Sequence, residues 1–131
     1  MELKYEQEVD HCNLDDYSPK DREAFRWVFD DINHPNNFLP PIKITPERDK
    51  RDCGLWAVSF FDTIEQAKSR FKEITKDKTY LYKKLGQNVA NGNLSVDDGI
   101  SCDSNEQGHF DLHEYVGVDL SSKFAIVDSL I

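Results

Sequence analysis

The sequence predicts an α+β fold in which residues 1–131 form a single domain, with two main helices packed on a small mixed or antiparallel sheet. A length of 131 residues suits one hydrophobic core rather than two. The chain is 38% hydrophobic and contains eight Phe, five Tyr and two Trp, which is enough apolar volume to fill that core. Helical spacing occurs in two segments before residue 76, whereas the C-terminal third has strand and turn patterns.

Two segments predict the main helices. The first begins at Ser18-Pro19, because Ser is a good N-cap and Pro is tolerated at the first helical position, and it ends near Pro35. Its buried face consists of Phe25, Val28, Phe29 and Ile32. The second begins at Asp62 or Thr63, where Glu65 or Gln66 completes a capping box. Its buried stripe consists of Ile64, Ala67, Phe71 and Ile74.

The remaining N-terminal elements are shorter. Residues 3–9 alternate loosely and predict an edge strand, and the proline-rich residues 36–46 predict an ordered, extended crossing loop. Residues 55–61 are apolar on both alternating faces, which is typical of a central strand covered on both sides. A short helix around residues 80–85 is expected to end at Gly86.

The C-terminal third predicts β-structure. Asn91-Gly92 is a hairpin-type turn signal, and residues 97–99 indicate another turn. Residues 109–116 and 123–130 predict two strands that pair with each other as antiparallel neighbours.

The charge distribution bears on possible partners. The net charge is −9, with −6 in residues 1–31, −7 in residues 95–131, +3 in residues 53–94 and +1 in residues 32–52. General affinity for nucleic acid or for an anionic membrane surface is therefore not expected, and no apolar run approaches the ~20 residues that span a bilayer. The short basic stripe in residues 68–84 is interpreted as a solvated helix face.

The cysteines bear on the compartment. Cys12, Cys53 and Cys102 are odd in number and widely spread, and the chain has no Cys-x-x-Cys pair. This pattern predicts free thiols rather than a disulfide framework. The acidic N-terminus lacks the pattern of a signal peptide, so we expect a cytoplasmic protein.

The densest group of polar residues gives the candidate site. On a strand, His109, Asp111 and His113 project from one face, and Glu114 follows directly. Imidazole titrates near neutral pH and an adjacent carboxylate orients it, so these four residues are the candidate catalytic group. The alternative is a half-exposed strand whose polar residues face water.

Metal and cofactor signals are weak. Two imidazoles and a carboxylate could bind a divalent metal, but the sequence fixes no further ligand. Residues 103–114 match part of the EF-hand template, with Asp103, Asn105, Gly108 and Glu114 at the first, third, sixth and twelfth places. The flanking segments are poor helix formers and no second loop exists. We therefore expect no metal and, because phosphate-loop and dinucleotide fingerprints are absent, no resident cofactor.

A second group of candidate residues is spread along the sequence. Arg26, Ser59 and Glu114 follow one another as an Arg, a strand-borne Ser before a helix, and a late Glu. This order loosely resembles the layout of ADP-ribosyltransferases. The resemblance implies that Arg26 holds the phosphate of a nicotinamide cofactor and that Glu114 steadies the developing ribosyl cation. Arg26 departs from the family by its predicted place on a helix, and Ser59 by the sequence Ser-Phe-Phe in place of Ser-Thr-Ser.

Two functions are carried forward. The first is a small acidic binding protein, of the immunity-protein or antitoxin type, that docks on a basic protein partner, since opposite fields speed association. The second is a small enzyme or ligand-binding domain centred on His109, Asp111, His113 and Glu114.

Overall fold

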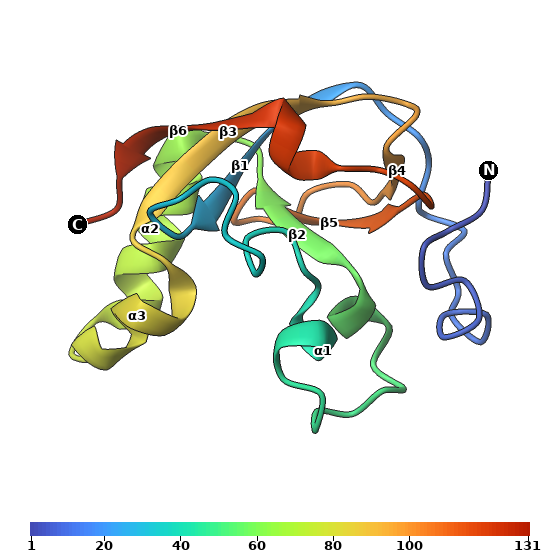
Figure 1. Ribbon diagram of the computed structural model, residues 1–131, viewed down its shortest axis with the longest axis horizontal. Helices are drawn as coiled ribbons and strands as arrows, with labels where there is room; N and C mark the ends of the chain where they lie inside the picture. The colour runs from blue at the N-terminus through green and yellow to red at the C-terminus, as the bar shows by residue number, and fades with distance from the viewer.

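The computed structural model covers residues 1–131 and contains a six-stranded antiparallel sheet (Figure 1). The strand order is β4-β5-β2-β1-β3-β6, so β2 and β1 occupy the centre. The expected α+β class is confirmed, and the sheet is antiparallel rather than mixed. The strands are β1 (Arg22–Val28), β2 (Val58–Phe61), β3 (Asn88–Leu94), β4 (Gly99–Ser101), β5 (His109–Glu114) and β6 (Phe124–Ser129).

One helix, α2 (Ile64–Thr75), is long enough to cover the sheet. Its predicted cap is confirmed, because the Thr63 side chain accepts a hydrogen bond from the backbone N–H of Gln66 at 3.1 Å. The short helix α3 (Tyr82–Leu85) ends at Gly86 as expected, where φ is +86°. The other helical segments are α1 (Pro41–Ile44) and the 3₁₀ turns Cys53–Trp56, Thr79–Leu81 and Leu120–Lys123.

The prediction of a helix over residues 18–32 is wrong, because this segment contains β1. Ala24 and Val28 face one side of the sheet, while Phe25 and Trp27 face the other. Apolar residues on both faces of a strand can imitate helical spacing. Seven consecutive residues of β1 pair with β3, and this long-range pairing outweighs the local helix signals at Ser18-Pro19.

The two central strands meet over a short distance only. β1 and β2 pair in register at Phe25 and Phe61, whereas β1 pairs with β3 along its whole length. The sheet therefore consists of two halves, β4-β5-β2 and β1-β3-β6. The junction between them, paired at Phe25 and Phe61, is named the seam.

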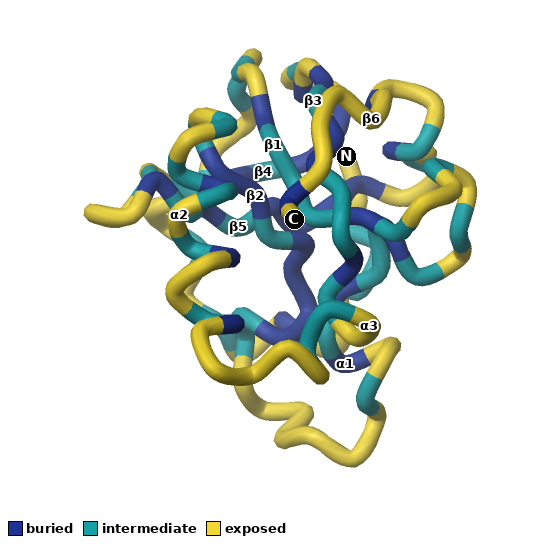
Figure 2. The backbone as a smooth tube through the Cα atoms, turned by 90° about the vertical axis from the view of Figure 1, so that its left-hand side faces the viewer, coloured by how far each residue is buried: buried dark blue, intermediate teal, exposed yellow.

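Each face of the sheet has its own core. One face carries ten buried residues, among them Val58, Phe60 and Phe110. The other packs against α2 through Ala67 and Phe71. Buried segments run through the middle of the molecule and exposed segments form most of its loops (Figure 2).

The two C-terminal strands form as β5 and β6, but they do not pair with each other. β5 lies between β4 and β2, whereas β6 pairs with β3 at the opposite edge. The hairpin turn expected at Asn91-Gly92 is also wrong, since both residues lie inside β3. A Cβ on Gly92 would lie 2.5 Å from the carbonyl oxygen of Lys123, so this glycine permits close approach of the chain entering β6.

The N-terminal residues do not form the expected edge strand. They make turns, with an isolated bridge between Leu3 and Tyr115. Residues 36–46 cross from β1 to β2, but the expected extended conformation is wrong. The segment begins with turns and contains the helix α1, since proline is tolerated in the first turn of a helix. Four buried residues from these regions and the following turn form a separate group, named the N-terminal cluster: Val9, Ile42, Leu55 and Trp56.

A disulfide joins Cys12 to Cys53 beside this cluster, so the prediction of three free thiols is wrong for two of them. Spacing alone could not show that folding brings residues 41 positions apart within bonding distance. Cys102 is free and half-buried. The expectation of a cytoplasmic protein rested partly on free cysteines, and the disulfide removes that argument. The compartment stays a prediction. No helix of this fold combines the length and apolar character needed to cross a bilayer.

Removing the disulfide should destabilise the fold. For a closed loop with a sequence separation of 41, the loss of cross-linking in the unfolded chain corresponds to about 4 kcal/mol. We expect Cys12→Ser and Cys53→Ser each to lower the free energy of unfolding by about 2–4 kcal/mol, measured by urea denaturation. Cys102→Ser is the matched control and should change it by less than about 1 kcal/mol. Equal stability of the Cys12→Ser and Cys102→Ser variants would contradict the assignment.

Candidate functional site

The four residues of the predicted site share β5 but do not converge. Alternation places His109, Asp111 and His113 on one face and Glu114 on the other. The structure brings His109 and Asp111 together, with His109 Nε2 3.8 Å from Asp111 Oδ1. His113 and Glu114 have different surroundings.

His113 is a core residue. Its exposed fraction is 3%, and its ring lies 5.2 Å from that of Tyr17, measured between centroids. Burial lowers the pKa of His113 to about 4, so the ring is neutral at physiological pH. Its Nε2 is buried without a hydrogen-bond partner. These surroundings fit a packing role better than proton transfer.

Glu114 belongs to the contact with the N-terminal segment. Its carboxylate pairs with Lys4 at 2.9 Å, and the Lys4 ammonium also donates to the carbonyl oxygen of Val118. Burial raises the pKa of Glu114, and the hydrogen bond from Lys4 opposes that shift. Glu114 lines a smaller pocket of about 210 Å³ together with Lys4 and His34.

A larger cleft of about 400 Å³ opens where the seam, α2 and α3 meet. Of the four predicted residues, His109 alone lines this cleft. Its apolar walls come from β1, β2, the loop after β1, and the helices: Trp27, Phe29, Ile44, Phe61, Ile74 and Leu85. Its uncharged polar walls are Asn36, Asn37, Ser59, Asn105 and Gln107.

The charges in the cleft have one sign. Arg26, Arg70 and Lys84 line it, and no Asp or Glu does. Arg70 forms an ion pair with Glu73 at 2.7 Å, and Lys84 is exposed and forms none. A cationic cleft in a chain with a net charge of −9 differs sharply from the average surface.

Arg26 lies at the seam, where pairing of β1 with β2 stops. Its Nε donates to the carbonyl oxygen of Asn37 at 2.6 Å, and its Nη1 to that of Ser59 at 2.8 Å. Nη1 also approaches Ser59 Oγ at 3.4 Å, whereas Nη2 donates to no protein atom. Burial lowers the pKa of Arg26 to about 10, so the guanidinium stays charged at neutral pH.

Asn37 fixes this arrangement from the loop side. It is buried, and its side-chain amide donates to the carbonyl oxygens of Asp31 and Ile32. Its Oδ1 accepts from the backbone N–H of Phe29 at 2.8 Å. The carbonyl that receives Arg26 therefore belongs to a well-ordered loop.

The structure changes the comparison of Arg26, Ser59 and Glu114 with ADP-ribosyltransferases. Arg26 is on a strand, which removes one departure from the family, and it contacts Ser59. Glu114 is in the other pocket and does not join them. The carboxylate opposite Ser59 in the β2–β5 register is Asp111, whose pKa is raised by burial.

Sequence reasoning missed Arg70 and Lys84 as cleft residues. Both belong to the basic stripe of residues 68–84, whose pattern by itself indicates a solvated helix face. The available signal was the contrast between that stripe and the acidic ends. Placing the two side chains in one cleft required knowing that α2 and α3 meet the same edge of the seam.

No protein-family model, curated protein or solved structure matches this chain. The functional conclusion therefore rests on the geometry of the chain itself.

Burial of His113 should make stability sensitive to acid. Its pKa is about 4 in the folded chain and 6.5 when unperturbed, so the unfolded state binds more protons between these values. The free energy of unfolding should therefore fall below pH 6.5, by of order 1 kcal/mol per pH unit from this residue. We expect His113→Phe to lose stability less steeply, in urea titrations at pH 7.5 and 5.0. Identical slopes for the two proteins would contradict this prediction.

Proposed function

We propose that this chain binds a small anionic ligand that carries an aromatic ring, such as a nucleotide, in the cleft at the seam. The observation that carries the proposal is the lining: three cationic side chains and three aromatic ones, without a carboxylate. A volume of about 400 Å³ is within the usual range for small-molecule sites.

The cations and the aromatic walls suit different parts of such a ligand. Two backbone carbonyls accept hydrogen bonds from Nε and Nη1 of Arg26, and Nη2 has no protein acceptor. Nη2 can therefore donate to a phosphate while the other two hydrogen bonds remain. Lys84 adds an unpaired charge at the rim. Trp27, Phe29 and Phe61 offer apolar surface for a flat base or pyridine ring.

A more specific proposal is transfer of an ADP-ribosyl group from a nicotinamide dinucleotide. The contact between Arg26 and Ser59 on adjacent central strands supports it, because these are two of the three residues that carry the resemblance to ADP-ribosyltransferases. In this proposal Arg26 binds phosphate, and Asp111, opposite Ser59, replaces Glu114. Asp111 does not itself line the cleft, so its carboxylate stabilises positive charge on the ribose from beside His109, whose Nε2 lies 3.8 Å away.

A second candidate function is the docking of a basic protein on an acidic surface. Contacts between the N-terminal segment and the C-terminal third favour it. The backbone N–H of Val116 donates to the carbonyl oxygen of Glu2 at 2.9 Å, and Ser18 forms an isolated β-bridge with Ser101. The acidic segments 1–31 and 95–131 are thus neighbours. Retention of a basic protein from a lysate at low salt, lost on replacing Glu2 and Asp97 with Gln and Asn, would test it.

Ligand binding by the cleft can be measured with AMP, ADP-ribose and NAD⁺ by calorimetry, with adenosine as the uncharged comparison. We expect the phosphorylated compounds to bind at least about tenfold more tightly than adenosine, since charge-assisted hydrogen bonds carry the recognition. Lys84→Gln should weaken binding about threefold to tenfold. Lys83→Gln, which changes the neighbouring exposed lysine outside the cleft, should leave it unchanged. Equal affinity for adenosine and AMP would contradict the proposal.

The transfer reaction has its own test. Hydrolysis of NAD⁺ by water gives ADP-ribose, nicotinamide and a proton, and release of nicotinamide can be followed by chromatography. We expect Asp111→Asn to abolish turnover while changing NAD⁺ affinity less than about threefold, because the carboxylate acts mainly in the transition state. Asp119→Asn is the exposed control. Binding of NAD⁺ without turnover in the unchanged protein would remove the transfer step and leave the binding proposal intact.

A further inference from the structure

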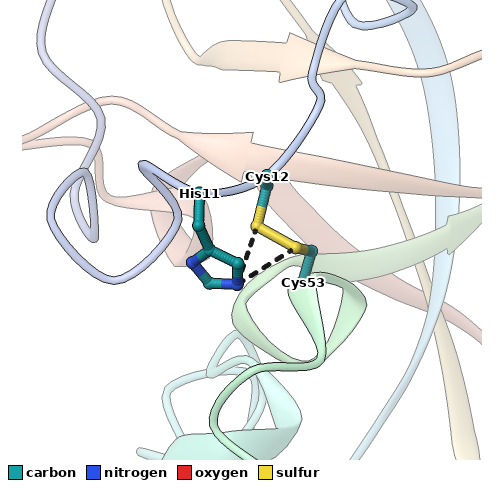
Figure 3. Close-up of side chains that lie close together, drawn as sticks. All are labelled: His11, Cys12 and Cys53. Carbon is teal, nitrogen blue, oxygen red and sulfur yellow. Dashed lines mark hydrogen bonds between the residues drawn. A yellow bond between two sulfur atoms is a disulfide. The ribbon is translucent and has the colours of Figure 1, made fainter.

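The imidazole of His11 lies next to the disulfide. The Nε2 atom of His11 lies 3.7 Å from the sulfur of Cys12 and 3.8 Å from that of Cys53 (Figure 3). The three potential ligand atoms lie within 4.8 Å of one another. His11 is exposed and the cysteines are half-buried, so the group is open to solvent on one side. It is separate from the cleft, because none of the three residues lines it.

These distances suit a tetrahedral metal site. With Zn–S bonds of about 2.3 Å and Zn–N bonds of about 2.0 Å, neighbouring ligand atoms in a tetrahedron are about 3.5–3.8 Å apart. Both nitrogen–sulfur distances are within about 0.3 Å of the ~3.5 Å that a nitrogen and a sulfur on one tetrahedral zinc require. The sulfur atoms alone must separate, and rotation of the cysteine side chains on Cα atoms 6.1 Å apart permits this.

The two segments have contacts that do not depend on the disulfide. Val9 packs with Leu55 and Trp56 in the N-terminal cluster. The backbone N–H of Cys12 donates to the carbonyl oxygen of Val9 at 2.9 Å, and Asp52 caps the turn at Cys53 by accepting from the N–H of Gly54. After reduction these contacts keep the two thiols near His11.

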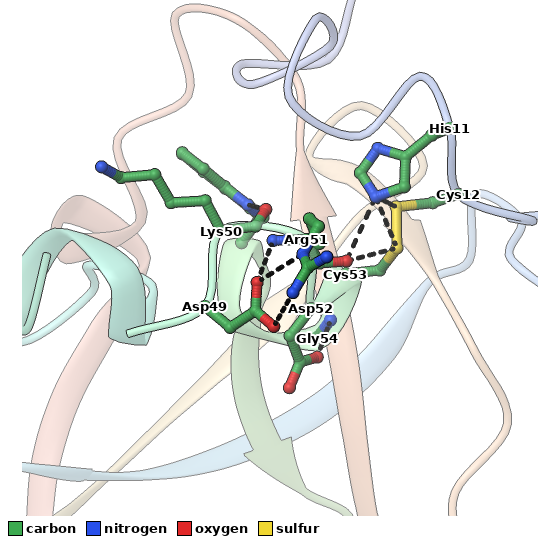
Figure 4. Close-up of a disulfide and its surroundings, with 9 residues drawn as sticks. His11, Cys12, Asp49, Lys50, Arg51, Asp52, Cys53 and Gly54 are labelled. Carbon is green, nitrogen blue, oxygen red and sulfur yellow. Dashed lines mark hydrogen bonds and ion pairs between the residues drawn. A yellow bond between two sulfur atoms is a disulfide. The ribbon is translucent and has the colours of Figure 1, made fainter. Parts of the chain in front are cut away.

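The loop beside the disulfide makes one backbone contact with the imidazole (Figure 4). His11 Nε2 lies 3.1 Å from the carbonyl oxygen of Arg51, a single exposed contact that a metal bond can replace. The nearby carboxylates are otherwise engaged, since Asp49 binds Arg51 and Asp52 caps the turn. Three protein ligands are therefore present, and the fourth position faces water.

We propose that the reduced chain binds one Zn²⁺ through His11 Nε2 and the thiolates of Cys12 and Cys53, with water as the fourth ligand. A dithiol reductant supplies two electrons and two protons, which convert the disulfide into two thiols while the reductant becomes a disulfide itself. Zn²⁺ then displaces the thiol protons to solvent. The same two segments are thus joined by a covalent bond in one state and by a metal in the other. Two thiolates and one imidazole are a donor set that zinc prefers.

The test uses the full chain, reduced with dithiothreitol and desalted without oxygen. Titration with Co²⁺ should give the absorption bands of a tetrahedral thiolate site at one equivalent, and Zn²⁺ should remove them. His11→Asn, an exposed change, should weaken Zn²⁺ affinity more than about tenfold. Cys12→Ser should abolish the bands, and Cys102→Ser, which lies outside the group, should bind as the unchanged chain does.

Thiol protection provides a second readout with an internal control. Zn²⁺ should slow alkylation of Cys12 and Cys53 by iodoacetamide, measured by mass spectrometry, but not that of Cys102. It should also raise the melting temperature of the reduced chain, since a ligand that binds the folded state stabilises it. A lower melting temperature would show binding to the unfolded chain and would overturn the proposal. Equal affinity of the His11→Asn variant, or absence of binding, would also overturn it.

Discussion

The guanidinium of Arg26 occupies the place where two central strands cease to pair, and both the sheet and the cleft depend on it. β1 and β2 share register at Phe25 and Phe61, and beyond this point the Ser59 carbonyl receives Arg26 instead of a backbone N–H. A buried carbonyl without a hydrogen-bond donor is costly. The Arg26 side chain therefore supplies the hydrogen bond that backbone pairing between β1 and β2 does not provide. The same side chain brings a positive charge to the cleft.

Local charge in this molecule differs from its total charge. The chain carries −9, yet the cleft at the seam is lined by cations, because α2 and α3 bring part of the basic stripe of residues 68–84 toward the seam. The acidic residues concentrate at the two ends of the chain, which are in contact through Lys4 and Glu114. A net charge describes solubility and long-range steering, whereas the charge of a site depends on which segments meet there.

Sequence patterns predicted the elements whose signals are local. The cap at Thr63, the stop at Gly86 and the position of β5 follow from short-range rules, and the structure has all three. Features set by distant partners were beyond reach: β1 is a strand because β3 pairs with it, and Cys12 meets Cys53 because the N-terminal cluster joins them. The candidate site shows the same difference between local signals and long-range contacts. His109 lines the cleft, as its place on a predicted strand allows, whereas His113 is equivalent by alternation but is buried against Tyr17, a residue that no pattern places there.

The bond between Cys12 and Cys53 closes a ring that contains the whole of β1, and β2 begins just outside it. In the unfolded oxidised chain, the path along covalent bonds from Phe25 to Phe61 is therefore shorter through the disulfide than along the backbone. Closing a shorter loop costs less conformational entropy, and contacts between near neighbours form sooner. The cross-link thus favours early assembly of the seam, which has little backbone pairing of its own to hold the two halves of the sheet together.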